Sequence, residues 1–152
     1  MKIFCTGNKS KKDFKSVLLN IKSIIEINES EFYLDVDKSY SDISCHMLSF
    51  GEIFNRNIDL VISIGGDGSL LASIQKMNIT QIPVLGIHIG NLGFLNQLDL
   101  SNYEIYLPDI ILSTQINYDE NYLISANVFN SKEILEYSFI GFNDIVINHG
   151  KL

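Results

Sequence analysis

One acidic side chain stands among glycines in the segment Gly65–Ser69 (GGDGS; the first loop). The preceding residues Leu60–Ile64 are nearly all apolar or β-branched, which is typical of a strand buried on both faces. Glycines let a backbone approach a phosphate closely, and the start of the helix predicted to follow attracts anions. Phosphates would repel the Asp67 carboxylate unless it binds a metal ion or accepts a proton from an attacking hydroxyl. The first loop therefore predicts a phosphate site at which Asp67 performs chemistry.

A structural interpretation of the first loop is equally consistent with the residue types, because Asp67 or Ser69 is also suited to cap the following helix. Three glycines at the end of a strand favour function over capping. The segment is not a Walker phosphate loop, because no lysine follows the glycines. It also lacks the G-x-G-x-x-G spacing of dinucleotide-binding loops.

A second glycine-bearing segment, Gly86–Leu95 (GIHIGNLGFL), follows another apolar run at residues 83–87. The carboxyl ends of neighbouring parallel strands lie at one edge of a sheet, where ligands bind. We therefore expect the two segments to form the two sides of one cleft. His88 in the second segment is interpreted as a loop residue rather than as a catalytic base. Further along, the pair Asn143-Asp144 follows a region rich in strand-forming residues.

The first loop, the segment Gly86–Phe94 and the pair Asn143-Asp144 together resemble the NAD kinase family. That family carries a Gly-Gly-Asp-Gly loop after a strand, then a Gly-x-x-x-Gly-x-Leu-Gly-Phe segment, then an Asn followed by an acidic residue at the start of a β domain. The order and spacing agree, and the resemblance covers nearly the whole chain. It implies that ATP, with Mg²⁺, phosphorylates the 2′-hydroxyl on the adenosine ribose of NAD to give NADP.

The resemblance also implies roles for individual residues. Asp67 would accept the proton of the 2′-hydroxyl, Gly68 would line the same pocket and Phe94 would pack near the bound nucleotide. Asn143 and Asp144 would hydrogen-bond the NAD. The residues expected to hold the ATP phosphates are Gly65, Gly66, Gly68 and Ser69. No side chain is assigned to the metal ion.

Strand and helix patterns alternate over residues 1–100, which predicts a doubly wound α/β domain: a mostly parallel sheet with helices on both faces. The expected strands are 2–6, 31–36, 60–64 and 83–87, and the expected helices are 14–25, 42–55 and 69–77. Residues 101–152 are expected to form a connecting segment and an incomplete all-β second domain. The segment would contain a short helix over 101–113 interrupted by Pro108, and the β domain three strands between 115 and 148.

Charge and composition exclude several function classes. The 152 residues carry a formal net charge of −7, and residues 81–152 hold two lysines against eight acidic residues. This balance argues against binding to nucleic acid or to an anionic membrane. Positive charge beside a phosphate substrate would then come from metal ions and backbone dipoles. The lysines between Lys9 and Lys15 are interpreted as a solvated helix face, and His46 and His149 as solvated or packed.

Cysteine content and length complete the expectations. The two cysteines, Cys5 and Cys45, are widely spaced, and the N-terminus lacks a signal-peptide core, which together favour the cytoplasm. Members of the NAD kinase family are considerably longer than this chain. We therefore expect the N-terminal half of an NAD kinase, or a truncated form of one, which turns over poorly alone. The resemblance implies a homo-oligomer for the full-length form.

Two other functions stay open at this point. A Gly-Gly-Asp-Gly loop also occurs in lipid kinases that act on diacylglycerol- or sphingosine-type substrates. Those kinases are not expected to share Leu92-Gly93-Phe94 together with Asn143-Asp144. A non-catalytic nucleotide-binding module is the third possibility, since an intact Asp67 does not separate such a module from an enzyme.

Overall fold

The computed structural model describes residues 1–38, 40–90 and 93–148 of the chain. Asn91, Leu92 and His149 therefore lie outside the described residues. The chain forms two compact units, Met1–Tyr118 and Asp119–Leu152. The first contains a six-stranded sheet and the second a two-stranded sheet. Within the described ranges, no helix is long and apolar enough to cross a membrane.

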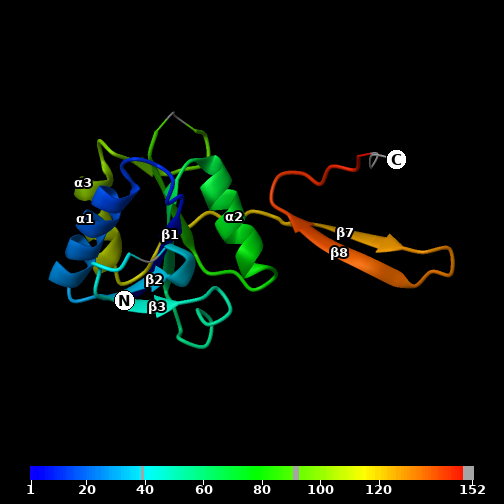
Figure 1. The fold of residues 1–152 in the computed structure, drawn as a ribbon, viewed down its shortest axis with the longest axis horizontal. Helices are drawn as coiled ribbons and strands as arrows, with labels where there is room; N and C mark the ends of the chain where they lie inside the picture. Colours follow the sequence, from blue (N-terminus) through cyan, green and yellow to red (C-terminus); the bar gives the residue numbers. More distant parts are fainter. Residues whose placement is uncertain (39, 91–92, 149–152) are drawn as a thin grey trace. The chain divides into compact units, whose positions relative to one another are not determined.

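The first unit is built on a sheet whose strands all run parallel (Figure 1). Their order is β3-β2-β1-β4-β5-β6. Their bounds are β1 Lys2–Gly7, β2 Glu31–Asp35, β3 His46–Leu48, β4 Leu60–Gly65, β5 Val84–His88 and β6 Leu98–Asp99. The chain builds from β1 outward to β3 and then returns to the other side of β1 with β4. This order confirms the predicted doubly wound α/β fold.

Strand β4 lies in the middle of the sheet, and all six of its residues are buried. Its side chains enter the cores on both faces, with Ile62 and Ile64 on one face and Val61 on the other. A strand without a polar face is stable only between two covered faces. Strand β4 therefore fixes the first loop at the centre of the carboxyl edge of the sheet.

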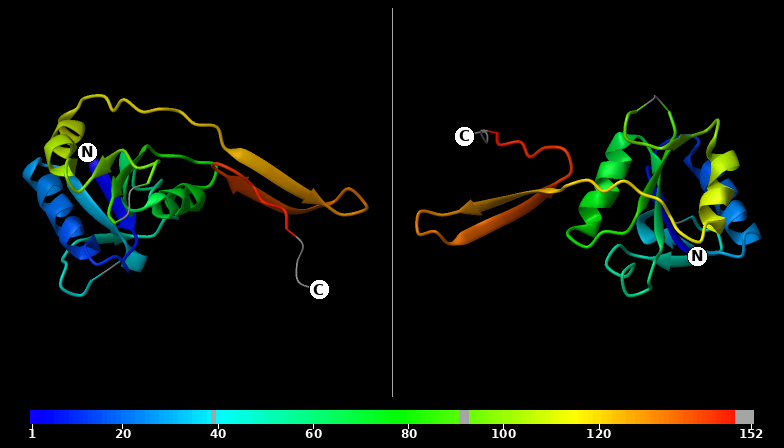
Figure 2. Two further views of the ribbon diagram at one scale, coloured as in Figure 1. Left: turned by 90° about the horizontal axis from the view of Figure 1, so that it is seen from above. Right: turned by 180° about the vertical axis from the view of Figure 1, so that it is seen from behind.

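Helices cover both faces of this sheet (Figures 1 and 2). Helices α1 (Phe14–Ile27) and α3 (Tyr103–Leu112) contribute to the core on one face, whereas α2 (Asp67–Met77) contributes to the core on the other. The buried side chains of α1 recur at three- and four-residue steps: Phe14, Val17, Leu18, Ile21 and Ile25. This is the predicted stripe of a helix that packs with one face.

The helix predicted over residues 42–55 is wrong. This segment contains β3, which pairs with β2, followed by turns. A short 3₁₀ helix, η1 (Val36–Lys38), lies between β2 and β3. Ile43 belongs to the core under α1, whereas Phe50 packs against the core on the opposite face. One helix would direct its apolar side chains to a single core, whereas Ile43 and Phe50 contact cores on opposite faces of the sheet. The pairing of β3 with β2 therefore outweighs the weak helical periodicity of this segment.

The first unit extends beyond the boundary expected at residue 100. Helix α3 continues through Pro108, so the predicted interruption is wrong. The buried residues of α3 join the same core as α1: Tyr103, Leu107 and Ile111. The amide of Asn20 in α1 also donates a hydrogen bond to the Tyr103 hydroxyl, at 2.8 Å. Because α3 covers the core of the parallel sheet, the first compact unit includes it and ends at Tyr118.

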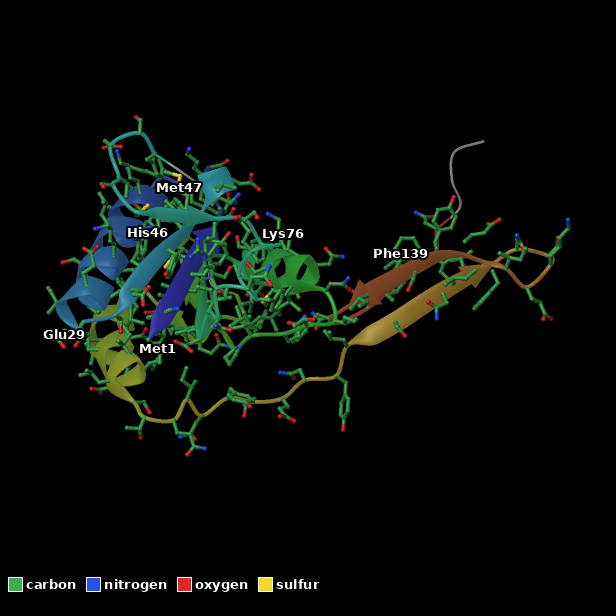
Figure 3. The ribbon with its side chains drawn as sticks, turned by 90° about the horizontal axis from the view of Figure 1, so that it is seen from below. Met1, Glu29, His46, Met47, Lys76 and Phe139 are labelled. Carbon is green, nitrogen blue, oxygen red and sulfur yellow. The ribbon has the colours of Figure 1, made fainter. Side chains whose placement is uncertain are left out.

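The second unit contains an antiparallel hairpin of β7 (Ile124–Phe129) and β8 (Leu135–Gly141). The register places apolar side chains on one face: Ile124, Ala126, Val128, Tyr137 and Phe139. The rings of Tyr137 and Phe139 stack with centroids 6.2 Å apart, and Figure 3 labels Phe139 on β8. The strand predicted near residues 144–148 does not form, because no strand of the described chain pairs with this segment.

Truncating Ile21 to alanine should lower the free energy of unfolding of the first unit by about 2–5 kcal/mol. The reason is that this side chain is fully buried between α1 and the sheet. Ile27 lies on the same helix but is 77% exposed, which makes Ile27→Ala a matched control with a change below about 0.5 kcal/mol. Urea unfolding followed by far-UV circular dichroism measures both changes. An equal decrease in the free energy of unfolding in the two variants would contradict the described packing of α1.

Candidate active site

Asp67 is the first residue of α2 and follows β4 after a single glycine. The residue that caps α2 is Gly66, and no side chain forms a cap hydrogen bond there. Helix capping by Asp67 or Ser69, the alternative left open by the sequence, is therefore not what the structure shows. The Asp67 carboxylate is instead used in contacts with another part of the chain.

Three hydrogen bonds attach the Asp67 carboxylate to the second loop (residues 89–97, described at 89–90 and 93–97). The backbone N–H of Phe94 donates to Oδ2 at 2.9 Å. The backbone N–H of Leu95 and the side-chain amide of Asn96 donate to Oδ1, at 3.2 and 2.9 Å. The two glycine-bearing segments are therefore neighbours, as predicted, and Asp67 joins them.

These donors favour the charged carboxylate. The Phe94 N–H, helped by the Leu95 N–H and the Asn96 amide, holds the pKa of Asp67 below its usual range. A carboxylate oxygen can accept two hydrogen bonds. Oδ2 accepts one bond within the described chain and Oδ1 accepts two. Asp67 is therefore ionised at neutral pH and keeps one acceptor position on Oδ2 for a ligand.

Glycine is required at two positions of this arrangement. A Cβ at Gly93 would lie 2.2 Å from Oδ1 of Asp67, far inside contact distance. Gly65 has a φ of +158°, and a Cβ there would lie 2.2 Å from Oγ of Ser69. Close approach of the second loop to Asp67, and of α2 to the end of β4, thus explains both glycines.

Backbone hydrogen bonds hold the neighbouring loops together at the same edge. The N–H of Ile89 donates to the carbonyl of Gly65 at 3.0 Å, which ties the second loop to the end of β4. The N–H of Asn8, after β1, donates to the carbonyl of Ile64 at 2.9 Å. The segments that follow β1 and β5 are therefore both hydrogen-bonded to the end of β4.

The other predicted residues of the first unit lie around Asp67. Phe94 donates its backbone N–H to the carboxylate and is 99% exposed, so its side chain is accessible to a ligand. Gly68 is exposed in the first turn of α2, and Gly66 and Ser69 are partly exposed next to it. The structure thus gathers the predicted first-loop residues and Phe94 at one place.

Asn143 and Asp144 belong to the second unit. Both are exposed and follow β8 directly, without regular secondary structure. Their expected contact with the same nucleotide as Asp67 stays a prediction.

The sequence interpretation missed Asn96 and misplaced His88. Asn96 is the only side-chain donor to Asp67 among the described residues. The sequence feature that could have indicated this role is its position directly after Gly93-Phe94-Leu95. His88 is not in a loop, because it is the last residue of β5 and is buried. Neither ring nitrogen of His88 has a hydrogen-bond partner in the described part of the chain.

Comparison with known proteins identifies the family. The sequence model described as the ATP-NAD kinase N-terminal domain matches residues 14–114. The chain is also 40% identical, over 119 residues, to an NAD kinase of Sulfurimonas denitrificans. This chain belongs to the NAD kinase family. A second relative, an NAD kinase of Chromohalobacter salexigens, is 39% identical over 94 residues.

Solved structures of the NAD kinase family share the fold. Yeast NADH kinase complexed with NADH superposes with a TM-score of 0.79 at 18% identity, over 94% of this chain and 47% of that chain. An NAD kinase from Archaeoglobus fulgidus in complex with ATP gives a TM-score of 0.51 at 24% identity, over 74% of this chain and 37% of that chain. These relatives do not favour the lipid-kinase alternative.

The chain spans less than half the length of the first relatives it matches. The match covers 76% of this chain and 39% of the Sulfurimonas denitrificans NAD kinase. For the Chromohalobacter salexigens NAD kinase the corresponding shares are 61% and 31%.

Replacing Gly93 by alanine should raise the pKa of Asp67 toward the ordinary aspartate value of about 3.9, because the new Cβ displaces the donors of the second loop. In the wild type, the folded-state pKa lies below the unfolded-state pKa. The resulting stabilisation is present above about pH 4 and disappears as the pH falls through the folded-state pKa. Gly93→Ala should therefore lose less stability on acidification. NMR titration of the Asp67 carboxyl carbon and urea unfolding at several pH values measure the two effects.

Gly68→Ala provides the matched control, because a Cβ at Gly68 meets no atom within 4 Å. Its Asp67 pKa should equal that of the wild type. An unchanged pKa in Gly93→Ala as well would show that the second loop does not lower the pKa of Asp67.

Proposed function

We propose that this chain supplies the catalytic carboxylate of an NAD kinase, which transfers the γ-phosphoryl group of ATP to the 2′-hydroxyl on the adenosine ribose of NAD. The observation that carries this proposal is the position of Asp67. It is an ionised carboxylate at the carboxyl edge of a parallel sheet, joined to the exposed Phe94 segment. That edge is where ligands bind in open α/β sheets.

In the proposed reaction, Oδ2 of Asp67 accepts a hydrogen bond from the 2′-hydroxyl and orients its oxygen. That oxygen forms a bond to the γ-phosphorus while the bond from the γ-phosphorus to the bridging oxygen of ADP breaks. The hydroxyl proton passes to Asp67 and then to solvent, leaving NADP and ADP. Phosphoryl transfer has a loose transition state, so orientation matters more than basicity. A carboxylate with a lowered pKa suits this task.

We propose that Mg²⁺ enters with the ATP phosphates. Among the described residues, no group of three His, Cys, Asp or Glu side chains is placed to hold a metal ion. Mg²⁺ in such enzymes is commonly held by substrate phosphates, waters and one or two carboxylates. The described residues fit an ion held mainly by the phosphates and by water, and no side chain of the described chain is assigned to it. When bound, the ion neutralises phosphate charge.

The remaining assignments follow from the family. Asn143 and Asp144 are proposed to hydrogen-bond NAD, and both are exposed in the second unit. A homo-oligomer of the full-length form is proposed on the same basis. A cytoplasmic location is proposed from the two free cysteines, Cys5 and Cys45.

A chimaera tests the proposed reaction. In it, residues 1–152 of this chain replace the corresponding part of the Sulfurimonas denitrificans NAD kinase, which supplies the rest of an enzyme of this family. Incubated with ATP, Mg²⁺ and NAD, the chimaera should form NADP, detected with an NADP-specific dehydrogenase. Asp67→Asn should lower kcat by about a hundredfold or more, because general acid–base groups contribute at least that much.

Asp109→Asn serves as the matched control, since Asp109 is exposed on α3 and should leave kcat unchanged. Full NADP formation by the Asp67→Asn chimaera would remove Asp67 from the reaction. A folded chimaera that binds nucleotides without forming NADP would support the non-catalytic alternative instead.

The proposed contact of Asn143 with NAD is tested separately. Asn143→Ala in the chimaera should raise the KM for NAD about two- to tenfold, the effect of losing one hydrogen bond. It should leave the KM for ATP unchanged. Asn127→Ala is the control, because Asn127 is an exposed residue of β7 in the same unit. Equal KM values for NAD in the two variants would contradict the assignment of Asn143.

A further inference from the structure

Two buried polar groups near Asp67 have no hydrogen-bond partner among the described residues. They are the ring of His88, at both Nδ1 and Nε2, and the side-chain carbonyl oxygen Oδ1 of Asn96. His88 is only 6% exposed, at the last position of β5. Burial without a hydrogen bond is unfavourable, so buried polar groups are nearly always paired, directly or through an ordered water. Both groups therefore require a partner that the described side chains do not supply directly.

The Asp67 carboxylate fixes the direction in which the Asn96 amide points. An ionised carboxylate only accepts hydrogen bonds, so the Asn96 group 2.9 Å from Oδ1 of Asp67 is the NH₂ group. The carbonyl oxygen of Asn96 then points away from Asp67. A Cβ on Gly86 would lie 2.4 Å from that oxygen, which places it against the middle of β5. The Gly86 N–H does not serve it, because this N–H donates to Oε1 of Gln97 at 2.8 Å.

His88 lies on the same face of β5 as Gly86. Alternate residues of a strand share a face, and Ile87 between them enters the core under α1 and α3 on the opposite face. Gly86 and His88 therefore face α2. The register agrees, because Ser63 of β4 pairs with Gly86, and its hydroxyl lies 3.2 Å from that of Ser73 on α2. The Asn96 carbonyl and the His88 ring thus share one buried strip of the sheet.

The spacing on this strip suits one bridging water. Side chains two residues apart on one face of a strand begin about 7 Å apart. One water that hydrogen-bonds to two polar atoms spans about 5.5 Å between them. The imidazole extends beyond its own Cβ by enough to cover the difference. A ring nitrogen of His88 can therefore reach Oδ1 of Asn96 through a single water.

His88 can act on Asp67 in two ways. The Phe94 N–H is the main cause that holds the pKa of Asp67 below its usual range, and the Asn96 amide contributes less. The charge of the His88 ring acts in the same direction and contributes least. A direct effect of that charge is therefore weak, whereas an effect through Asn96 would also move the carboxylate.

We propose that His88 is a positioning residue for Asp67, an inference that rests on the proposed function: a ring N–H of His88 holds the Asn96 carbonyl through one buried water, and Asn96 holds the Asp67 carboxylate. The water accepts a hydrogen bond from the ring and donates one to Oδ1 of Asn96, so each group gains a partner. With its amide fixed at both ends, Asn96 keeps its NH₂ group on Oδ1 of Asp67. The other oxygen, Oδ2, then stays turned toward the 2′-hydroxyl. His88 acts on the reaction without touching substrate.

NMR titration of the Asp67 carboxyl carbon in the 152-residue chain measures this connection. Asn96→Leu removes the amide and should raise the pKa of Asp67. His88→Phe removes the ring N–H and should raise that pKa as well. Because both changes break the same series of hydrogen bonds, the double variant should show no higher pKa than Asn96→Leu alone. Shifts that add in the double variant, or no shift in His88→Phe, would overturn the proposal.

His88→Gln separates the hydrogen bond from the charge of the ring. Glutamine keeps an N–H donor and carries no charge, so it should restore most of the wild-type pKa of Asp67. Equal pKa values of Asp67 in His88→Gln and His88→Phe would overturn the proposal. His88→Leu repeats the removal of the donor with a smaller side chain, which separates it from overpacking by the phenyl ring. Thermal unfolding midpoints establish that each variant is folded.

His46→Phe is the matched control for the loss of an imidazole. His46 is exposed on β3, at the edge of the sheet and on the far side of β1 from β5 (labelled in Figure 3). The pKa of Asp67 in this variant should equal that of the wild type. A shift as large as that of His88→Phe would contradict a specific role of His88.

The chimaera measures the effect on the reaction. His88→Phe should lower kcat about tenfold and change the KM values for NAD and ATP less than about twofold, because a slightly displaced carboxylate orients the hydroxyl less well. His88→Gln should recover most of kcat. A wild-type kcat in His88→Phe would overturn the positioning role. NADP formation that survives Asp67→Asn would instead remove the proposed function, and the pKa values in the 152-residue chain would still decide whether His88 acts through Asn96.

Discussion

The hydrogen bonds between the Asp67 carboxylate and the second loop determine the form of the candidate active site. Strand β4 brings Asp67 to the carboxyl edge of the sheet, and β5 brings the second loop beside it, since Gly65 and His88 are register partners. The Phe94 and Leu95 N–H groups and the Asn96 amide then attach the loop to the carboxylate. The same bonds lower the pKa of Asp67, so they hold the shape of the site and favour its charged carboxylate.

This contact depends on the middle of the parallel sheet. Strand β4 has no polar residue exposed to water, so it is stable only with helices on both faces. Helices α1 and α3 supply one cover and α2 the other, and α2 begins with the Asp67 that performs the proposed chemistry. Stability and function are therefore coupled at one point of the chain. Loss of packing under α2 would displace the carboxylate together with the first turn of the helix.

The distribution of charge over the folded chain does not follow from its net charge. Net charge and the scarcity of basic residues after residue 80 favour a site whose positive charge comes from metal ions and backbone dipoles. The folded chain also places Lys11, Lys38 and Lys76 around one cavity of about 440 Å³. The sequence does not reveal this cluster, because the three lysines are far apart in the chain. Lys11 follows β1, Lys38 ends η1 and Lys76 lies near the end of α2. Net charge describes solubility and partners in general, whereas binding depends on the local field.

The sequence by itself determined the fold class, and it predicted the first loop with Asp67 as the candidate functional residue. Buried strands such as Leu60–Ile64 and helix stripes such as that of α1 are local patterns with a strong hydrophobic signal. Only the tertiary structure decided that residues 46–48 pair as β3, that His88 is buried and that Asn96 binds Asp67. Each of these depends on groups distant in the chain that the strand order brings together. Local patterns record which face of an element is apolar, but not which element lies against it.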